Sequence, residues 1–322
     1  MKCLVLADEK SIKYFLGEDA VTGVLLIAKE KVLITPEIRK VEGVRVIRSN
    51  RVFDELKKQL LSFGIRKVYV PFDSTDKVFL ERLMNVVKVV DFSKELLEKR
   101  MVKTREEVKS IKEAVRITCE VIGKASEKIR QGIREKDLAR FILSEGLKEA
   151  DGIAFFPIVS AGVNTLKIHP LPTNNKIRKG EFIVVDCGFK VSGYCSDITR
   201  TFAIKPTEEQ VELFNIVREA QEIAVKRIKK AKFFSEPAKA VKAFFKQEGV
   251  FEDWCYSLGH GIGLDVHEEP SITVKSKDKV VKGVTFALEP GLITKTGGLR
   301  IEDDYYFNRK VKKLSGEAFL EL

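Results

Sequence analysis

The chain has 322 residues, enough for two domains that each bury a core, and it has no apolar run of the roughly 18 residues that span a membrane. Its 58 Lys and Arg residues against 47 Asp and Glu give a net charge of +11, which nucleic acid or an anionic membrane surface could attract. The basic residues are spread along the chain and mixed with Glu, as is typical of thermophilic proteins, so we expect no nucleic-acid and no membrane partner.

The five cysteines are odd in number, scattered and without a CxxC pair, which argues against a disulfide framework and against a zinc ribbon. At the N-terminus, Asp8 and Glu9 come before an apolar segment could develop, so no signal peptide is predicted. Both features indicate a cytoplasmic protein with reduced thiols.

The first hundred residues alternate short apolar runs with helical patterns, which predicts a small α/β domain over residues 1–100. Strands are expected at residues 3–7, 21–28, 31–36, 44–49 and 67–71. An amphipathic helix is expected between the last two strands, ending near Gly64, with an apolar face of Val52, Phe53, Leu56, Leu60 and Leu61.

A capping box of Thr104 and Glu107 opens a long helical pattern directly after this region. The apolar face of that helix holds Ile111, Val115, Thr118, Ile122, Ala125 and Ile129. We therefore place a boundary near residue 100 and assign residues 101–322 to a second domain. Two further helices are predicted, one capped by Thr207 and Gln210, the other with Ser235 as N-cap and Gly249 beyond its end.

Residues 181–204 form two β-rich runs around a short polar turn, which predicts a hairpin. A turn centred between Val191 and Ser192 would place Asp186 opposite Asp197. Two ionised carboxylates so close would repel each other unless a cation lay between them.

Residues 285–307 have the same layout, with turn residues Thr296, Gly297 and Gly298. A centre between Lys295 and Thr296 would place Glu289 opposite Glu302. Either acidic pair alone could be a solvated surface feature. Because both pairs lie in apolar strand contexts, where unpaired carboxylates are rare, they favour a cation site.

Only three histidines occur in the chain, and two of them, His260 and His267, lie in the stretch "SLGHGIGLDVHEEP" at residues 257–270. The glycines at 259, 261 and 263 would let the backbone approach a crowded centre. Four carboxylates and one imidazole suit two divalent cations, and such a pair activates water and polarises a carbonyl or phosphoryl group. A hydrolase is expected.

Four segments in this order, "DCGFKVSGYCSDITRT", "SLGHGIGLDVHE", "ALEPG" and "LRIEDD", resemble the metallopeptidases of the pita-bread fold, in the branch of Xaa-Pro dipeptidases (prolidases) and aminopeptidase P. The resemblance covers about residues 95 to 322. It implies an α+β fold, in which a pita-bread (creatinase/aminopeptidase-like) catalytic domain follows a smaller α/β domain of the creatinase-N kind.

By motif, the resemblance implies five metal ligands for two divalent ions per subunit: Asp186, Asp197, His260, Glu289 and Glu302. Mn or Co is expected, with Zn or Fe as alternatives. Glu289 would also handle the proton of the attacking water, while His267 and His169 would stabilise the tetrahedral intermediate.

Three further positions are expected near the substrate or around the ligands, namely Tyr194, Arg300 and Tyr256. Arg300 would pair with ligand carboxylates. Tyr256 stands where proline peptidases of this family frequently have histidine, four residues before His260, so it bears on substrate preference and leaves the metal ligands unchanged.

The resemblance implies hydrolysis of the bond preceding proline, in dipeptides or in short peptides with proline at the second position, by a homodimer. Aminopeptidase P activity remains an alternative. Methionine aminopeptidase activity fits the "SDITRT" segment less well, and creatinase-like chemistry does not need the ligands found here. A non-catalytic binding module of this fold is the remaining alternative, although such relatives typically lose ligands and this chain keeps all five.

Overall fold

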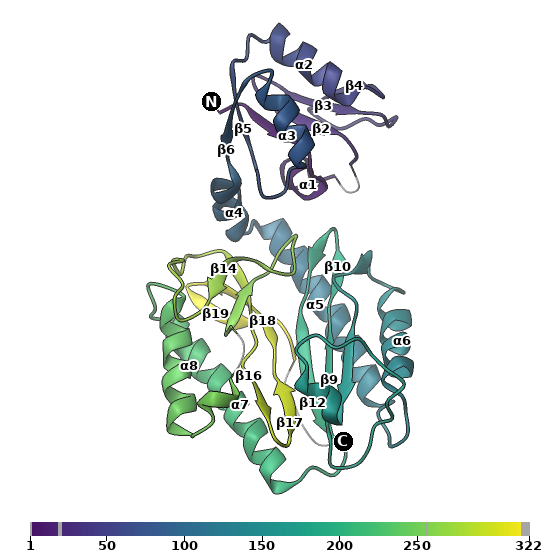
Figure 1. The fold of residues 1–322 in the computed structure, drawn as a ribbon, viewed down its shortest axis with the longest axis vertical. Helices are drawn as coiled ribbons and strands as arrows, with labels where there is room; N and C mark the ends of the chain where they lie inside the picture. The colour runs from purple at the N-terminus through teal and green to yellow at the C-terminus, as the bar shows by residue number, and fades with distance from the viewer. Residues whose placement is uncertain (1, 19–20, 255–256, 317–322) are drawn as a thin grey trace. The chain divides into compact units, whose positions relative to one another are not determined.

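The computed structural model describes residues 2–18, 21–254 and 257–316. The chain separates into two compact units, Met1–Arg100 and Met101–Leu322 (Figure 1). Each unit has its own sheets and its own buried clusters of apolar side chains.

The first unit is one six-stranded mixed sheet in the order β4-β3-β2-β1-β5-β6. Its strands are β1 (Leu4–Leu6), β2 (Val24–Ile27), β3 (Lys31–Thr35), β4 (Arg45–Arg48), β5 (Lys67–Val70) and β6 (Lys88–Asp91). Its helices are α1 (Glu9–Leu16), α2 (Val52–Ser62), α3 (Lys77–Met84) and α4 (Ser93–Met101). Alternate strand residues point to opposite faces, so Leu26 joins α2 and α3 in one core while Leu25 joins α1 and α4 in another.

The predicted strands and the predicted helix of this unit are all present, but α1, α3, β6 and α4 were not predicted. Leu56 and Leu60 of α2 are fully buried, whereas Leu61 is 64% exposed, so its placement on the apolar face was wrong. One residue after Leu60, the side chain has turned about 100° around the helix and faces solvent.

The second unit holds two halves (Figure 1). One half combines β8 (Ile158–Ala161), β9 (Phe182–Cys187) and β12 (Ile198–Ala203) with the small sheet of β7 (Gly152–Ile153), β10 (Phe189–Val191) and β11 (Tyr194–Cys195). Helices α5 (Arg105–Ser126) and α6 (Glu135–Gly146) pack against it.

The other half is a five-stranded sheet in the order β14-β13-β15-β18-β19, with the β16–β17 hairpin beside it. Its strands are β13 (Gly259–Gly261), β14 (Glu268–Ile272), β15 (Val284–Leu288), β16 (Gly291–Thr294), β17 (Gly297–Arg300), β18 (Asp303–Asn308) and β19 (Lys310–Lys313). Helices α7 (Glu208–Ile228) and α8 (Ser235–Gln247) share its core, and Val217 and Val241 belong to the same buried cluster as Phe286.

Both predicted capping boxes are present, at Thr104 with Glu107 and at Thr207 with Gln210. The prediction of Ser235 as N-cap was wrong, because α8 begins at Ser235 itself and no side chain caps it. Instead, the carboxylate of Glu236 accepts the backbone N–H groups of Lys232 and Phe233 just ahead of the helix.

The first predicted hairpin exists with a shifted register. Asp186 lies opposite Thr199, not Asp197. The reason is the turn, which is centred on Ser192 and Gly193; both have positive φ (48° and 75°), as a two-residue type I′ turn requires. The turn lies one residue later than predicted. Asp186 and Asp197 therefore point to the same face of the hairpin, but they form a diagonal pair and not a directly opposed one.

The second hairpin has the predicted register. Leu288 lies opposite Asp303 and Gly291 opposite Arg300, so Glu289 and Glu302 fall at matching positions between these pairs. Gly297 and Gly298 belong to β17 and not to the turn.

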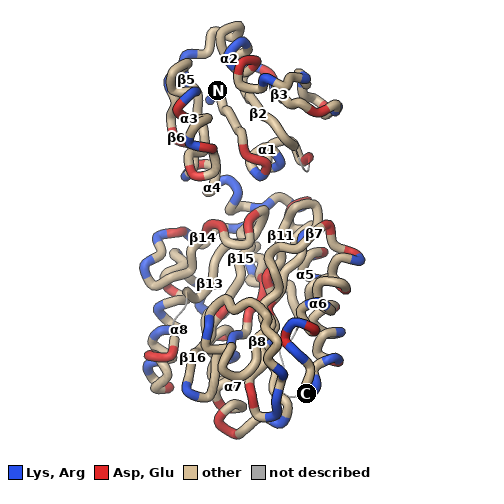
Figure 2. The backbone as a smooth tube through the Cα atoms, turned by 45° about the vertical axis from the view of Figure 1, so that its right-hand side comes forward, with Lys and Arg blue, Asp and Glu red and all other residues tan. Residues whose placement is uncertain are grey.

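None of the described helices combines the length with the apolar character that a membrane span needs. Lys and Arg residues are mixed with Asp and Glu residues along both units (Figure 2). No disulfide joins the four described cysteines, Cys3, Cys119, Cys187 and Cys195.

Candidate metal centre

The five carboxylate and imidazole residues predicted as ligands come together where the two halves of the second unit meet. Two overlapping groups contain all of them, Asp186 with Asp197 and Glu302, and His260 with Glu289 and Glu302. Within each group, one ligand atom per residue lies within 4.8 Å of the others. A third group joins His267 to Asp197 and His260.

The strand pairing explains this convergence. An isolated bridge between Thr199 and Glu302 joins β12 to the segment that precedes β18, so the two halves are linked at the centre itself. The guanidinium of Arg200 crosses the same seam and donates to the carbonyls of Thr199 (2.9 Å) and Glu302 (2.8 Å). Because backbone bonds fix this seam, the acidic side chains on both of its sides are held close together.

His260 lies in β13, where the pairing with β14 is interrupted by a bulge after His260. A Cβ at Gly259 would lie 2.1 Å from the carbonyl oxygen of Ala287, and one at Gly261 would lie 2.2 Å from that of Glu269. Only glycine therefore allows β13 to fit between its neighbours. The carbonyl of Gly261 lies 3.0 Å from Nδ1 of His260. A carbonyl can only accept, so Nδ1 carries a proton, and Nε2 is the ring nitrogen that faces the carboxylates.

Burial and crowding raise the pKa of three of these carboxyl groups. Desolvation raises the pKa of Asp186 to about 6, although Arg300 opposes the shift. It raises the pKa of Asp197 well above the ordinary value, with the charges of Glu302 and Asp186 adding to the effect. Burial and the charge of Glu302 raise the pKa of Glu289 to about 7. The cluster therefore binds positive charge strongly.

The histidines respond to the same charges. Burial alone would lower the pKa of His260, but the carboxylates of Glu302 and Glu289 outweigh it and raise the pKa to about 9. Burial and the neighbouring His260 lower the pKa of His267 to about 4. The two rings are tilted by 57°, with centroids 4.0 Å apart. Burial and Arg300 also lower the pKa of His169.

The donor set fits divalent cations. Three buried atoms of the cluster make no hydrogen bond with the described part of the chain, namely Oδ1 of Asp186, Oδ1 of Asp197 and Nε2 of His260. Such atoms are costly unless something binds them. Carboxylate oxygens with one imidazole nitrogen are ligands suited to first-row divalent metals.

Arg300 and Thr199 hold two of the carboxylates in place. The guanidinium of Arg300 donates to Oδ2 of Asp186, and its Nε donates to the hydroxyl of Thr199 at 3.0 Å. That hydroxyl in turn donates to Oε2 of Glu302 at 2.7 Å. Arg300 thus has the position expected of it, beside ligand carboxylates, whereas Thr199 was not predicted from the sequence.

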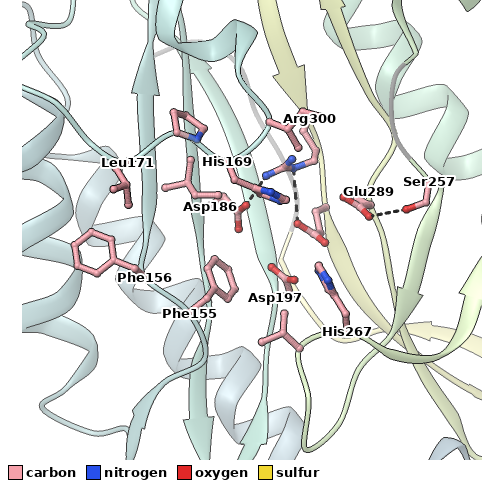
Figure 3. Close-up of a pocket in the computed structure, with 15 residues that line it drawn as sticks. Phe155, Phe156, His169, Leu171, Asp186, Asp197, Ser257, His267, Glu289 and Arg300 are labelled. Carbon is pink, nitrogen blue, oxygen red and sulfur yellow. Dashed lines mark hydrogen bonds and ion pairs between the residues drawn. The ribbon is translucent and has the colours of Figure 1, made fainter. Parts of the chain in front are cut away.

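A pocket of about 420 Å³ opens onto the cluster. His169 and His267 line it together with Asp186, Asp197 and Glu289 (Figure 3). Figure 3 shows the apolar side chains of Phe155, Phe156 and Leu171 across the pocket from Glu289 and Ser257. The hydroxyl of Ser257 donates to Oε1 of Glu289 at 3.2 Å.

Neither the apolar wall nor Ser257 was predicted from the sequence. Short runs such as "AFFP" give no periodicity from which to infer a pocket lining, and Ser257 lies 32 residues before Glu289.

Of the three further predicted positions, Arg300 is described above and Tyr256 falls outside the described residues. The hydroxyl of Tyr194 donates to Oε1 of Glu107 at 2.6 Å, in the capping box that starts α5, and Tyr194 is not among the residues that line the pocket.

The segment around His267 is fastened by a buried ion pair. Nζ of Lys103 lies 2.6 Å from Oε1 of Glu268, and both side chains are almost fully buried. A Cβ at Gly263 would lie 2.6 Å from the same carboxylate, so the loop between His260 and His267 folds tightly over it.

The profile of metallopeptidase family M24 matches residues 109–309. An Xaa-Pro dipeptidase of Pyrococcus horikoshii is 29% identical over 96% of this chain and 91% of its own. A prolidase structure from Pyrococcus horikoshii superposes with a TM-score of 0.92 at 28% identity, covering 99% of this chain and 95% of that one. An X-Pro aminopeptidase structure from Thermotoga maritima gives 0.90 at 28% identity, over 99% and 97% of the two chains.

Proposed function

This chain belongs to metallopeptidase family M24 and has the pita-bread fold, and from that premise we propose that it hydrolyses the peptide bond preceding proline in Xaa-Pro dipeptides. One observation carries the proposal: a cluster of four carboxylates and one imidazole faces a pocket that two further histidines line.

Asp186, Asp197, His260, Glu289 and Glu302 would hold two divalent cations per subunit. When bound, such ions lower the pKa of a water molecule and polarise a carbonyl group. An oxygen-rich donor set supports Mn or Co, with Zn or Fe as alternatives.

The remaining chemistry falls to side chains on the pocket wall. The carboxylate of Glu289 accepts the proton of the attacking water and returns it to the proline nitrogen that leaves. The imidazoles of His267 and His169 donate hydrogen bonds to the oxyanion that develops on the scissile carbonyl. Arg300 keeps the Asp186 carboxylate turned into the cluster.

The apolar side of the pocket supports the choice of proline. Phe155, Phe156 and Leu171 offer a surface for a saturated ring. The peptide bond before proline has no N–H group. It can therefore lie against an apolar wall without leaving a hydrogen-bond donor unpaired.

Xaa-Pro aminopeptidase activity on longer peptides is the second candidate. A neighbouring hollow of about 380 Å³ shares Phe156 and Leu171 with the pocket and is also lined by Lys136 and Arg140. A peptide that continued beyond proline could extend into this hollow.

An activity panel tests the proposal. Metal-stripped protein, with Mn²⁺ or Co²⁺ added back, is assayed on Ala-Pro, Ala-Pro-Ala and Met-Ala. We expect hydrolysis of Ala-Pro, dependence on added metal, and loss of activity in Asp197→Asn. Asp54→Asn, a surface change in the first unit, is the control and should keep full activity. Exclusive cleavage of Ala-Pro-Ala would favour the aminopeptidase, and full activity of Asp197→Asn would refute the metal assignment.

We also propose a homodimer and two separately folding domains, Met1–Arg100 and Met101–Leu322. The dimer rests on the resemblance to the prolidase branch, and light scattering of the purified chain tests it.

A further inference from the structure

Glu135, the first residue of α6, carries a fully buried carboxylate that contributes no atom to the pocket. A buried carboxylate needs strong hydrogen-bond donors to remain charged. Among the described residues, every group that donates a hydrogen bond to the Glu135 carboxylate belongs to one segment, residues 161–175.

The two carboxylate oxygens hold the two ends of that segment. Oε1 accepts the backbone N–H of Ala161 (2.9 Å) and the side-chain amides of Asn164 (3.0 Å) and Asn175 (3.2 Å). Oε2 accepts the backbone N–H and the hydroxyl of Thr173, at 2.8 and 2.7 Å. One side chain thus fastens residues that lie up to 14 positions apart in this segment.

Backbone hydrogen bonds also join the start of α6 to this segment. The N–H of Glu135 donates to the carbonyl of Asn175 (3.1 Å), and the N–H of Lys136 donates to that of Thr173 (3.1 Å). The amide of Asn175 also donates to the carbonyl of Ala161 at 3.1 Å. Both ends of the segment are therefore held at the start of α6. Thr165 is held in addition by the N–H of Gly298, which donates to its hydroxyl at 2.8 Å.

The part of the segment between these fastened ends forms the pocket wall. It carries His169 together with Ile168, Pro170 and Leu171, and all four line the pocket (Figure 3). Ile168, His169 and Leu171 are exposed, whereas Pro170 between them is buried. The His169 side chain itself is therefore not packed into a core, and its position depends on how the segment is fastened at Pro170 and at its two ends.

We infer that Glu135 is a positioning residue for His169: its carboxylate fixes residues 161–175 so that the imidazole reaches the scissile carbonyl. The inference rests on the proposed function for the role of His169. Glutamine cannot fully replace Glu135. Each carboxylate oxygen accepts a backbone N–H, from Ala161 or from Thr173, so the amide NH₂ would face a donor in either orientation.

Kinetics of Glu135→Gln on Ala-Pro test the inference. A misplaced imidazole should lower kcat about 10- to 100-fold, since an error of about 1 Å in position costs on the order of 100-fold. The matched control is Glu107→Gln, which alters another structural carboxylate, at the start of α5. It should change kcat less than twofold.

A double variant separates positioning from general damage. In a His169→Ala background, Glu135→Gln should lower kcat by less than threefold, because the group through which it acts is gone. An equal loss of kcat in both backgrounds would overturn the inference. A His169→Ala variant with full activity would overturn it as well, since His169 would then have no role to support.

Trypsin cleavage after the exposed Lys167 provides a readout that needs no activity. Cleavage, followed by mass spectrometry, should be at least tenfold faster in Glu135→Gln than in wild type or Glu107→Gln. Unchanged cleavage would overturn the inference even in an active enzyme. A further outcome is that wild type cleaves no Xaa-Pro peptide while trypsin still cleaves Glu135→Gln faster after Lys167. That result would refute the proposed function, but it would support the role of Glu135 in fastening residues 161–175.

Discussion

Thr199 shows how much a single neutral side chain contributes to the candidate metal centre. Its hydroxyl joins the Arg300 guanidinium to the Glu302 carboxylate and so fixes the orientation of both. Groups that orient metal ligands in this way are worth about 10- to 100-fold in metal affinity.

We therefore expect Thr199→Val, which keeps the shape and removes the hydroxyl, to weaken Mn²⁺ binding by about 10- to 100-fold. Isothermal titration of the metal-stripped protein measures the affinity. Thr35→Val changes another fully buried threonine, in the first unit, and should leave Mn²⁺ binding as in wild type. Equal affinities of Thr199→Val and wild type would show that the hydroxyl does not act on the ligands.

Glu135 also predicts a pH effect on stability. Burial would raise its pKa, but hydrogen bonds from Thr173, Asn164 and Ala161 outweigh burial and lower the pKa below the ordinary 4.5. A carboxyl group whose pKa is lower in the folded state stabilises the fold above its unfolded pKa, and this stability is lost as pH falls through the folded value.

The free energy of unfolding of wild type should therefore fall more steeply below pH 4.5 than that of Glu135→Gln. Urea denaturation of both proteins at several pH values between neutrality and the acid limit measures the two slopes. The other acidic groups titrate in both proteins, so the difference isolates Glu135. Parallel slopes would contradict the assignment.

For single residues, the sequence predicts the five clustered metal-ligand candidates, because carboxylates in apolar strands and a histidine flanked by glycines are recognisable from the local sequence. It does not predict Thr199 or Glu135. Their partners lie 103 residues away in one case and 26 to 40 in the other, so only the folded chain brings them together.

Strand β13 sets the position of His260 through close backbone contacts. Gly261→Ala would place a Cβ 2.2 Å from the carbonyl oxygen of Glu269, and the backbone of β13 or β14 would have to move. Overpacking of this kind costs about 1–3 kcal/mol. We expect chemical denaturation to show a loss in this range, together with weaker Mn²⁺ binding by titration.

Gly123→Ala is the matched control. Gly123 lies on α5, where an added Cβ meets nothing within 4 Å, and alanine favours a helix over glycine by up to about 1 kcal/mol. This variant should be as stable as wild type or more so. A Gly261→Ala protein with unchanged stability and metal affinity would show that β13 and β14 separate at no cost.

Turn chemistry decides how well the elements could be predicted. The turn of the second hairpin was predicted correctly. The turn of the first hairpin was predicted one residue too early in the chain, because Ser192 was not recognised as a residue with positive φ. Helix α6 was missed because Arg134, its N-cap, makes no capping hydrogen bond and so leaves no local signal.

In the part of the chain that the structure describes, the apolar clusters given for the two units have no buried residue in common. The buried clusters of the first unit end at Leu96, and the cluster around α7 and α8 begins at Phe182. Composition and the change of pattern near residue 100 predicted two domains, but only separate folding tests that prediction.

We expect a fragment of residues 101–322 to unfold in one cooperative transition, as domains with their own core do. Circular dichroism during urea titration detects the transition, and its slope should be smaller than that of the full chain because less surface is exposed. In the full chain, Leu26→Ala should lower the stability of the first unit by about 2–5 kcal/mol. A fragment without a cooperative transition would refute independent folding.

The ion pair of Lys103 and Glu268 has a practical consequence for anyone who recombines this protein with its relatives. Helix α5 begins at Arg105, which makes its start look like a natural splice point. A chimaera joined there would import a foreign residue in place of Lys103 and leave an acidic group without its ammonium partner next to His267. The first unit of a relative should therefore be joined to this protein directly before Met101, so that the native residues 101–104 are retained.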